Sequence, residues 1–185
     1  MEKRKSPVAE ALRVGAILLL ICSLVAGVVS FVYALTADAY AENIAAVKRE
    51  AISAIFGGEV DSTLVDKELP AGVLELYEVP VDGAGTHYCV NLNTPGFGGD
   101  MNMMVAIAPD GTVYGVQIVS MSETPGLGTR VGESDFLSLF TGKGGELVLG
   151  RDVDAIAGST ISSDAVLAGV NLALSAVAAH YDFVG

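Results

Sequence analysis

The chain has 185 residues and a formal net charge of −12, which is unevenly distributed. Before Leu35, four basic residues stand against two acidic ones, for a charge of +2, so the remainder carries −14. Phosphate-rich partners need clustered lysine and arginine, so this acidic balance excludes nucleic acid as a partner and disfavours docking onto anionic lipid. The length allows one membrane segment and one globular domain of ordinary size.

An uncharged, apolar run of 22 residues covers Val14–Leu35. As a helix rising 1.5 Å per residue it would span roughly 33 Å, enough for a hydrocarbon core of about 30 Å. Four basic residues precede it: Lys3, Arg4, Lys5 and Arg13. By the positive-inside rule they predict a cytoplasmic segment over 1–13 and an extracytoplasmic domain over 36–185. The sequence therefore predicts a single-pass protein of the cell (inner) membrane, in contact with lipid through one helix.

Two other interpretations of this run fit less well. A cleaved signal peptide would fit the small residues of Ala37–Ala39, but its apolar core would be longer than the usual 7–15 residues or so. Lipid attachment at Cys22 fits poorly because bulky Ile21 precedes it. Cys89 is the only other cysteine, so the domain has no internal disulfide.

A helix is expected next, because apolar residues recur at helical spacing over 37–56 before Gly57 and Gly58 end the pattern. The centre of the domain is a predicted β-hairpin, Met101–Ala108 and Val113–Ser120, joined by a turn that contains Pro109 and Gly111. Before the hairpin, the expected elements are short strands at Leu64–Val65 and Val73–Val79, a turn at 83–85 and a strand at Thr86–Leu92. After it, they are a helix at Ser134–Phe140 with a serine cap, a loop at 142–145, a short strand at Glu146–Leu149 and an apolar helix from Asp164 to about His180. Strands in mid-chain with helices at either end predict an α+β domain with an antiparallel sheet.

Three segments are the candidates for function, two of them rich in glycine and the third in hydroxyl side chains. Pro95–Asp100 leads into the hairpin, Ser122–Gly128 follows its second strand, and Gly158–Asp164 precedes the last helix with four hydroxyl side chains. The first two should lie close together because they open and close one hairpin. Hydroxyls at the start of a helix, among free backbone N–H groups and the positive end of the dipole, suit a phosphate.

A flavin would suit the glycines. Backbone can approach the flat isoalloxazine where no side chain intervenes, and its N–H groups can donate to the ring carbonyls and tune the redox centre. Leu127 is a suitable apolar contact for such a ring. Met103 and Met104 offer polarisable packing nearby, although methionine in a strand is more often plain core.

These segments resemble the FMN-binding domain of the Rnf complex G subunit and of the Na⁺-translocating NADH:quinone reductase C subunit. Ser122–Gly128 and Pro95–Gly99 match the family's segments, and Ala157–Thr160 stands where the family has Ser/Thr-Gly-Ala-Thr. The likeness runs from Thr86 to about Val177. The short length and single predicted anchor fit the Rnf G subunit better than the longer C subunit.

The resemblance implies covalent FMN, joined by a phosphoester to Thr160 by a Mg²⁺-dependent flavin transferase that uses FAD. It implies an electron-carrying subunit of a complex that couples ferredoxin:NAD⁺ electron transfer to Na⁺ or H⁺ translocation, with other membrane subunits as partners. Asp154 matches the acidic residue that precedes the family motif, and Ser159, in place of the usual alanine, is a competing hydroxyl together with Ser162. No residue is predicted to be catalytic. The expected cofactor-binding residues are Thr160, Ser159, Gly158, Ser162, Ser163, Glu123, Thr124, Gly126, Leu127, Gly128, Gly98 and Gly99.

Several alternatives stay open on the residues alone. The hydroxyl cluster could be a simple N-cap, and Arg130 could balance a phosphate or pair with an acid. His87 and Cys89 share a strand face, but without a second such cluster a metal site is not expected. The C subunit of the quinone reductase, a stand-alone extracytoplasmic flavin module and an anchored non-redox binding or structural protein are the rival functions.

Overall fold

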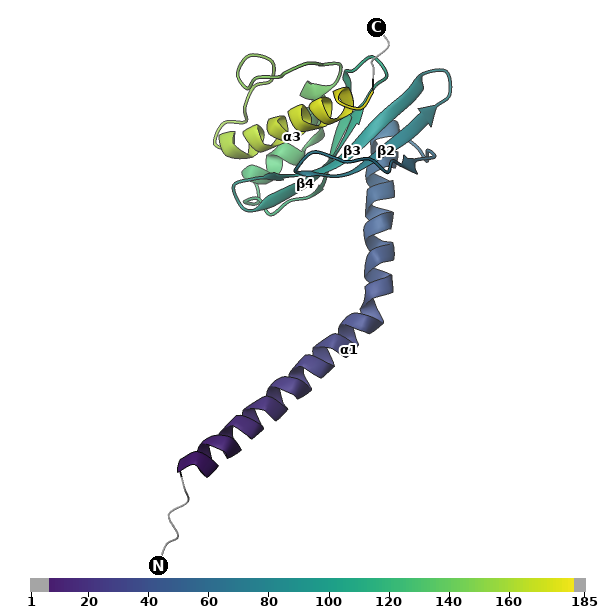
Figure 1. The fold of residues 1–185 in the computed structure, drawn as a ribbon. Helices are drawn as coiled ribbons and strands as arrows, with labels where there is room; N and C mark the ends of the chain where they lie inside the picture. The colour runs from purple at the N-terminus through teal and green to yellow at the C-terminus, as the bar shows by residue number, and fades with distance from the viewer. Residues whose placement is uncertain (1–6, 182–185) are drawn as a thin grey trace, which may run out of the picture. The chain divides into compact units, whose positions relative to one another are not determined.

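The computed structural model describes residues 7–181, and Figure 1 shows their arrangement. Among the described residues, 7–46 and 47–181 form separate units. The elements are α1 (Pro7–Phe56), β1 (Thr63–Leu64), β2 (Val73–Val81), β3 (Gly85–Pro95), β4 (Asp100–Ile107), β5 (Val113–Ser120), η1 (Gly128–Gly132), α2 (Ser134–Leu137), η2 (Ser138–Phe140) and α3 (Thr160–Ala178).

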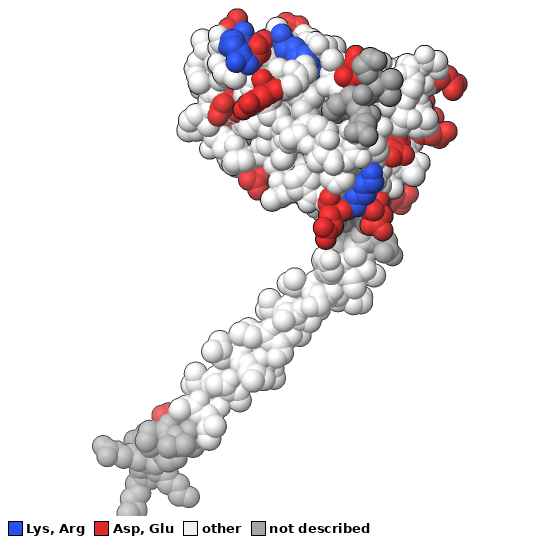
Figure 2. All heavy atoms as spheres, turned by 45° about the horizontal axis from the view of Figure 1, so that its top comes forward, with Lys and Arg blue, Asp and Glu red and all other residues white. Residues whose placement is uncertain are grey.

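The first unit is helical throughout its described part. Glu10–Ala37 is a 28-residue apolar stretch of α1 with a mean hydropathy of 2.6, and its most apolar part contains no buried residue. Figure 2 shows this stretch as a nearly uncharged surface. The predicted span at Val14–Leu35 falls inside it. Lys3, Arg4 and Lys5, on which the predicted orientation depends, lie outside the described residues.

The second unit contains a five-stranded sheet in the order β1-β2-β3-β4-β5, and every neighbouring pair is antiparallel. This confirms the predicted fold class. The hairpin of β4 and β5 is also confirmed, with Gly111 at a φ of 82° in its turn. β3 continues three residues past its predicted end at Leu92, and therefore leads directly into the glycine-rich turn before β4.

One face of the sheet, which we call the α3 face, packs against α3 and the short helices α2, η1 and η2. The main apolar core lies here. Fully buried residues come from neighbouring strands and from the helices that cover them, such as Leu92, Met103, Phe140 and Val170. Gly169 allows this close packing, since a Cβ there would lie 2.5 Å from the sulfur of Met103.

The opposite face, the α1 face, packs against residues 47–56 of α1. Its apolar cluster is smaller and comprises Ala51, Ile52, Val79, Cys89, Met104 and Ala106. Burial raises the pKa of the Cys89 thiol to about 12, which makes it an unreactive core residue.

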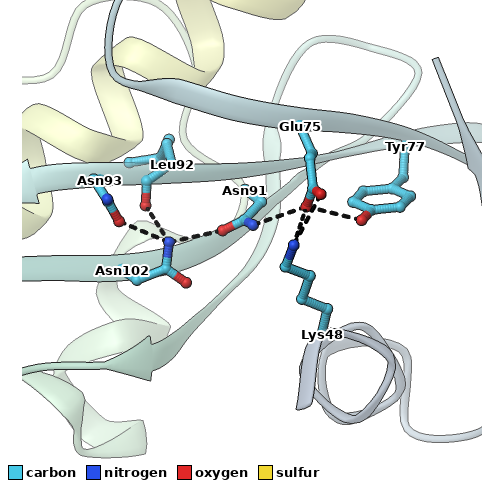
Figure 3. Close-up of polar contacts among 7 residues, drawn as sticks. All are labelled: Lys48, Glu75, Tyr77, Asn91, Leu92, Asn93 and Asn102. Atoms are coloured by element: carbon cyan, nitrogen blue, oxygen red, sulfur yellow. Dashed lines mark hydrogen bonds and ion pairs between the residues drawn. The ribbon is translucent and has the colours of Figure 1, made fainter. Parts of the chain in front are cut away.

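A polar network lies on the same face (Figure 3). Lys48 from α1 pairs with Glu75 on β2 at 2.7 Å, and Glu75 also accepts hydrogen bonds from Tyr77 at 2.9 Å and Asn91 at 3.0 Å. Asn102 on β4 extends the network by donating to Asn91 at 2.9 Å. Burial acts to raise the pKa of Glu75, but the hydrogen bonds and the Lys48 charge outweigh it and hold that pKa below its usual range.

Three local predictions were wrong. Ser134 does not cap its helix, because the N-cap is Glu133 and no side chain caps that end. Residues 146–149 are not a strand, since the Asn171 side chain bonds both the N–H and the carbonyl of Leu147, leaving those groups unavailable to a ladder. The last helix begins at Thr160 rather than Asp164.

Candidate functional site

The three candidate segments meet at one pocket of about 320 Å³. Residues from the turn before β4, from the loop after β5 and from the start of α3 line it: Phe97, Glu123, Thr124, Leu127, Gly128, Gly158, Ser159, Thr160, Ile161 and Ser162. The convergence predicted for the first two segments is therefore present, and the third segment joins them.

Glu123 ties the three segments together. It is 6% exposed, and its Oε1 accepts hydrogen bonds from the backbone N–H groups of Phe97 at 2.8 Å and Gly98 at 3.2 Å. Its Oε2 accepts the hydroxyl of Ser162, from α3, at 2.8 Å. One carboxylate thus bonds to both other walls of the pocket.

The glycines make room for this carboxylate. A Cβ on Gly96 would collide with Oε1 of Glu123, and a Cβ on Gly128 would lie 2.5 Å from Oε2. A Cβ on Gly98 would collide with the backbone carbonyl of Ser122. The sequence suggested backbone approach to a flat ring as the reason for the glycines, whereas here they let backbone close around Glu123.

The hydroxyl side chains at the start of α3 differ sharply in exposure. Ser159 is 5% exposed and donates to the carbonyl oxygen of Leu127 at 2.8 Å. Ser163 is fully buried, donates to the Ser159 carbonyl and accepts the N–H of Ile156. With Ser162 bonded to Glu123, Thr160 is the one exposed hydroxyl of the set.

The hydroxyl cluster does not act as an N-cap. Ser159 occupies the N-cap position, but no side chain there bonds the backbone N–H groups of the first turn. The N–H groups at the start of a helix have no intrahelical partner, and they carry the positive end of the helix dipole. Thr160 is the first helical residue and is exposed, so it lies at this end of α3.

Large apolar side chains around the pocket are exposed. Phe97 is 67% exposed, Leu127 is 45% and Ile161 is 57%. Leu127 was expected as an apolar contact for a ring, whereas Phe97 and Ile161 were missed as wall residues. Phe97 lies within the first glycine-dense segment, so its position there was the available signal.

Some expected site residues lie away from the pocket wall. Gly98 reaches the site through its N–H, and Ser163 supports the start of α3 from the interior. Gly99 and Gly126 adopt positive φ in the two loops without lining the cavity, and Arg130 is an exposed residue of η1. Met103 and Met104 are core residues on opposite faces of the sheet, and Asp154 is exposed in the loop before α3.

His87 and Cys89 do share the α1 face, where they are buried. The His87 ring packs edge-on against Phe56 and Tyr114, and Cys89 belongs to the apolar cluster. Within residues 7–181, no group of three or more His, Cys, Asp or Glu side chains is placed to hold a metal ion.

Comparison with known proteins shows what this domain resembles. Residues 96–175 match the family model of the FMN-binding domain. The chain is 34% identical over 121 residues to the G subunit of the Na⁺-translocating ferredoxin:NAD⁺ oxidoreductase complex of Acetobacterium woodii, covering 60% of this chain and 58% of that one. It is 32% identical over 142 residues to the G subunit of an ion-translocating oxidoreductase complex of Cereibacter sphaeroides, covering 70% and 64%.

Among solved structures, the C subunit of the Na⁺-translocating NADH-quinone reductase of Parabacteroides distasonis is similar, with a TM-score of 0.48 and 25% identity, covering 56% of this chain and 60% of that one. The chain spans about half to two thirds of the length of the curated relatives it matches. Residues 96–175 are therefore similar to the FMN-binding domain family, and the resemblance to the Rnf G subunits is confirmed.

Proposed function

We propose that this chain is a membrane-anchored flavoprotein, the electron-carrying subunit of an Rnf-type complex. The complex would couple electron transfer between ferredoxin and NAD⁺ to movement of Na⁺ or H⁺. This chain would receive and pass on electrons through one FMN and bind neither substrate itself. The similarity to G subunits of ion-translocating oxidoreductase complexes supports this role.

The observation that carries the proposal is the exposure of Thr160. An acceptor hydroxyl must be reachable by a loading enzyme and must be free of competing hydrogen bonds. Ser159 and Ser162 are buried and bonded to Leu127 and Glu123, whereas Thr160 is exposed on the pocket rim. The choice among the three hydroxyls therefore falls on Thr160.

The fit of the pocket to FMN is favourable at both ends of the cofactor. A phosphate on Thr160 would lie beside the N-terminus of α3, where free N–H groups and the dipole stabilise an anion. The exposed apolar groups of Phe97, Leu127 and Ile161 offer cover for the apolar ring, which explains three large hydrophobic side chains in contact with solvent.

The attachment reaction needs little from this chain. The Thr160 oxygen would form a bond to the FMN phosphorus of FAD, the pyrophosphate bond would break, AMP would leave, and the hydroxyl proton would pass to a base of the transferase. Covalent attachment suits an exposed site, because a reversibly bound cofactor would be lost to a dilute exterior.

The placement in the membrane belongs to the same proposal. Residues 14–35 would cross the membrane once, with 1–13 in the cytoplasm and 36–185 outside. The apolar stretch Glu10–Ala37 supports a crossing segment by its length and hydropathy. The other helix that is long and apolar enough to cross a membrane, Thr160–Ala178, is mostly buried, because it is the core helix α3 of the domain.

The test is the intact mass of the full-length chain after coexpression with a flavin transferase. The wild-type chain should gain one FMN and give a fluorescent band on a denaturing gel. Thr160→Ala should lose both completely, whereas Ser159→Ala, the matched control, should keep the full adduct. A wild-type chain without an adduct, or an adduct that persists in Thr160→Ala, defeats the proposal.

A further inference from the structure

The environment of the Glu123 carboxylate is unusual for a charge in a protein interior. Two of its three hydrogen-bond partners are backbone N–H groups, which can only donate, and both bond Oε1. Within the described residues, no lysine or arginine forms an ion pair with it. All its hydrogen-bond partners are neutral groups, so an ionised Glu123 would leave a net negative charge among the residues that line the pocket.

Glu75, by contrast, is a carboxylate of this chain whose charge is paired with a cation. Glu75 has a lysine at 2.7 Å that cancels its charge. A buried carboxylate without a cation is costly, since removing a charge from water is only partly offset by hydrogen bonds. A purely structural tie between three loops could be made with a neutral amide.

From these observations we propose that Glu123, through its negative charge, lowers the reduction potential of the flavin carried by Thr160. This inference rests on the proposed function. Reduction adds electrons to the ring, and a fixed negative charge in a poorly screened site opposes that gain. Glu123 exchanges no electrons itself. It shifts the equilibrium between the oxidised and reduced cofactor toward the oxidised form.

The packing holds the carboxylate in place. Ser162 bonds Oε2 from the turn of α3 that also carries Thr160, and Gly96 and Gly128 close over the two oxygens. These contacts fix the carboxylate of Glu123, a residue that lines the pocket. Ser162, which bonds the carboxylate, lies in the same turn of α3 as Thr160, the residue that would hold the cofactor.

The experiment uses the full-length chain, loaded by a flavin transferase and solubilised in detergent. The adduct is first counted by intact mass, and the midpoint potential is then measured by titration with dithionite, which supplies both electrons. Glu123→Gln keeps the shape and removes the charge. We expect its reduction equilibrium to shift at least tenfold toward the reduced form, which is about 30 mV for a two-electron couple.

Two further variants separate charge from structure. Ser162→Ala removes one donor and leaves the charge less compensated, so the potential should move in the opposite direction, to more negative values. Glu133→Gln makes the same chemical change at an exposed residue outside the pocket, and its potential should match that of the wild type. A merely structural role predicts shifts of the same sign in Glu123→Gln and Ser162→Ala.

The outcomes are distinguishable from those of the proposed function. A wild-type chain that takes up no FMN contradicts the function itself. If the loaded Glu123→Gln chain has the same midpoint potential as the wild type, the electrostatic role alone is contradicted. The same holds if Glu133→Gln shifts the midpoint potential as much as Glu123→Gln does. If Glu123→Gln does not fold, the sign of the Ser162→Ala shift decides, and a shift to more positive values overturns the inference.

Discussion

On the α1 face of the sheet, Glu75 is bonded to Lys48, Tyr77 and Asn91. On the side of the sheet covered by α3, Glu123 is bonded only to backbone N–H groups and one hydroxyl. Both carboxylates join segments that are distant in the chain. The first joins a helix to the sheet with its charge cancelled, while the second joins three loops around a pocket and keeps its charge.

The difference separates a structural role from a functional one. A charge that only has to hold two elements together is best paired, because pairing lowers its cost in the interior. A charge beside a redox cofactor has an effect only while it is uncompensated. The partners of each carboxylate, rather than its burial, therefore indicate what it does.

The largest expected effect is at the tight contact around Glu123. Gly128→Ala would place a Cβ 2.5 Å from Oε2 of Glu123 and 3.1 Å from Oγ of Ser162. Overpacking of this kind costs about 1–3 kcal/mol, and we expect the upper part of that range because the site is enclosed on both sides. Urea unfolding of the solubilised chain would measure it. Gly58→Ala has open space and should leave stability nearly unchanged, so equal losses in both variants would contradict the role given to Gly128.

A smaller effect is expected on the α1 face. Glu75→Gln keeps acceptors for Tyr77 and Asn91 but removes the charge that pairs with Lys48. Because the pair is partly exposed, we expect a loss of about 1 kcal/mol. The same unfolding assay checks it, with the double variant Glu75→Gln/Lys48→Met as the control. Recovery of part of the loss in the double variant is expected; a purely additive loss would show that the pair contributes nothing.

The pH dependence of this face is the smallest expected effect. The folded-state pKa of Glu75 lies below its unfolded value, so the stabilisation is fully present above the unfolded value of about 4.3. It is lost as pH falls through the lower folded-state pKa. When the free energy of unfolding is measured from pH 7 down to pH 3, it should fall more steeply at the acid end for the wild type than for Glu75→Gln. Parallel profiles would show that Glu75 is not linked to folding.

Much of the fold could be predicted because its signals are local. The hairpin of β4 and β5 follows from two alternating runs around Pro109–Thr112, and the end of α1 at Phe56 follows from Gly57, whose φ is 71°. The predicted strand at 146–149 failed because Asn171, a residue of α3, occupies the backbone groups of Leu147. No local pattern can show a partner 24 residues away.

The site was predicted in part for the same reason. Glycine density marked the first two segments, and the hydroxyl-rich motif marked the third segment and Thr160. The sequence placed Glu123 only as a wall residue, since its partner Ser162 is 39 residues away along the chain. Ser159 looked like a competing acceptor until its bond to Leu127 placed it in the interior.

By itself, the sequence determined the apolar N-terminal run, the antiparallel hairpin and the family that the domain resembles, because each depends on residue types at short or constant spacing. Only the tertiary structure decided which hydroxyl faces solvent and which carboxylate keeps an unpaired charge. Exposure and pairing depend on segments that meet in space through the packing of α3 on the sheet, and that packing brings together residues that lie far apart in the chain.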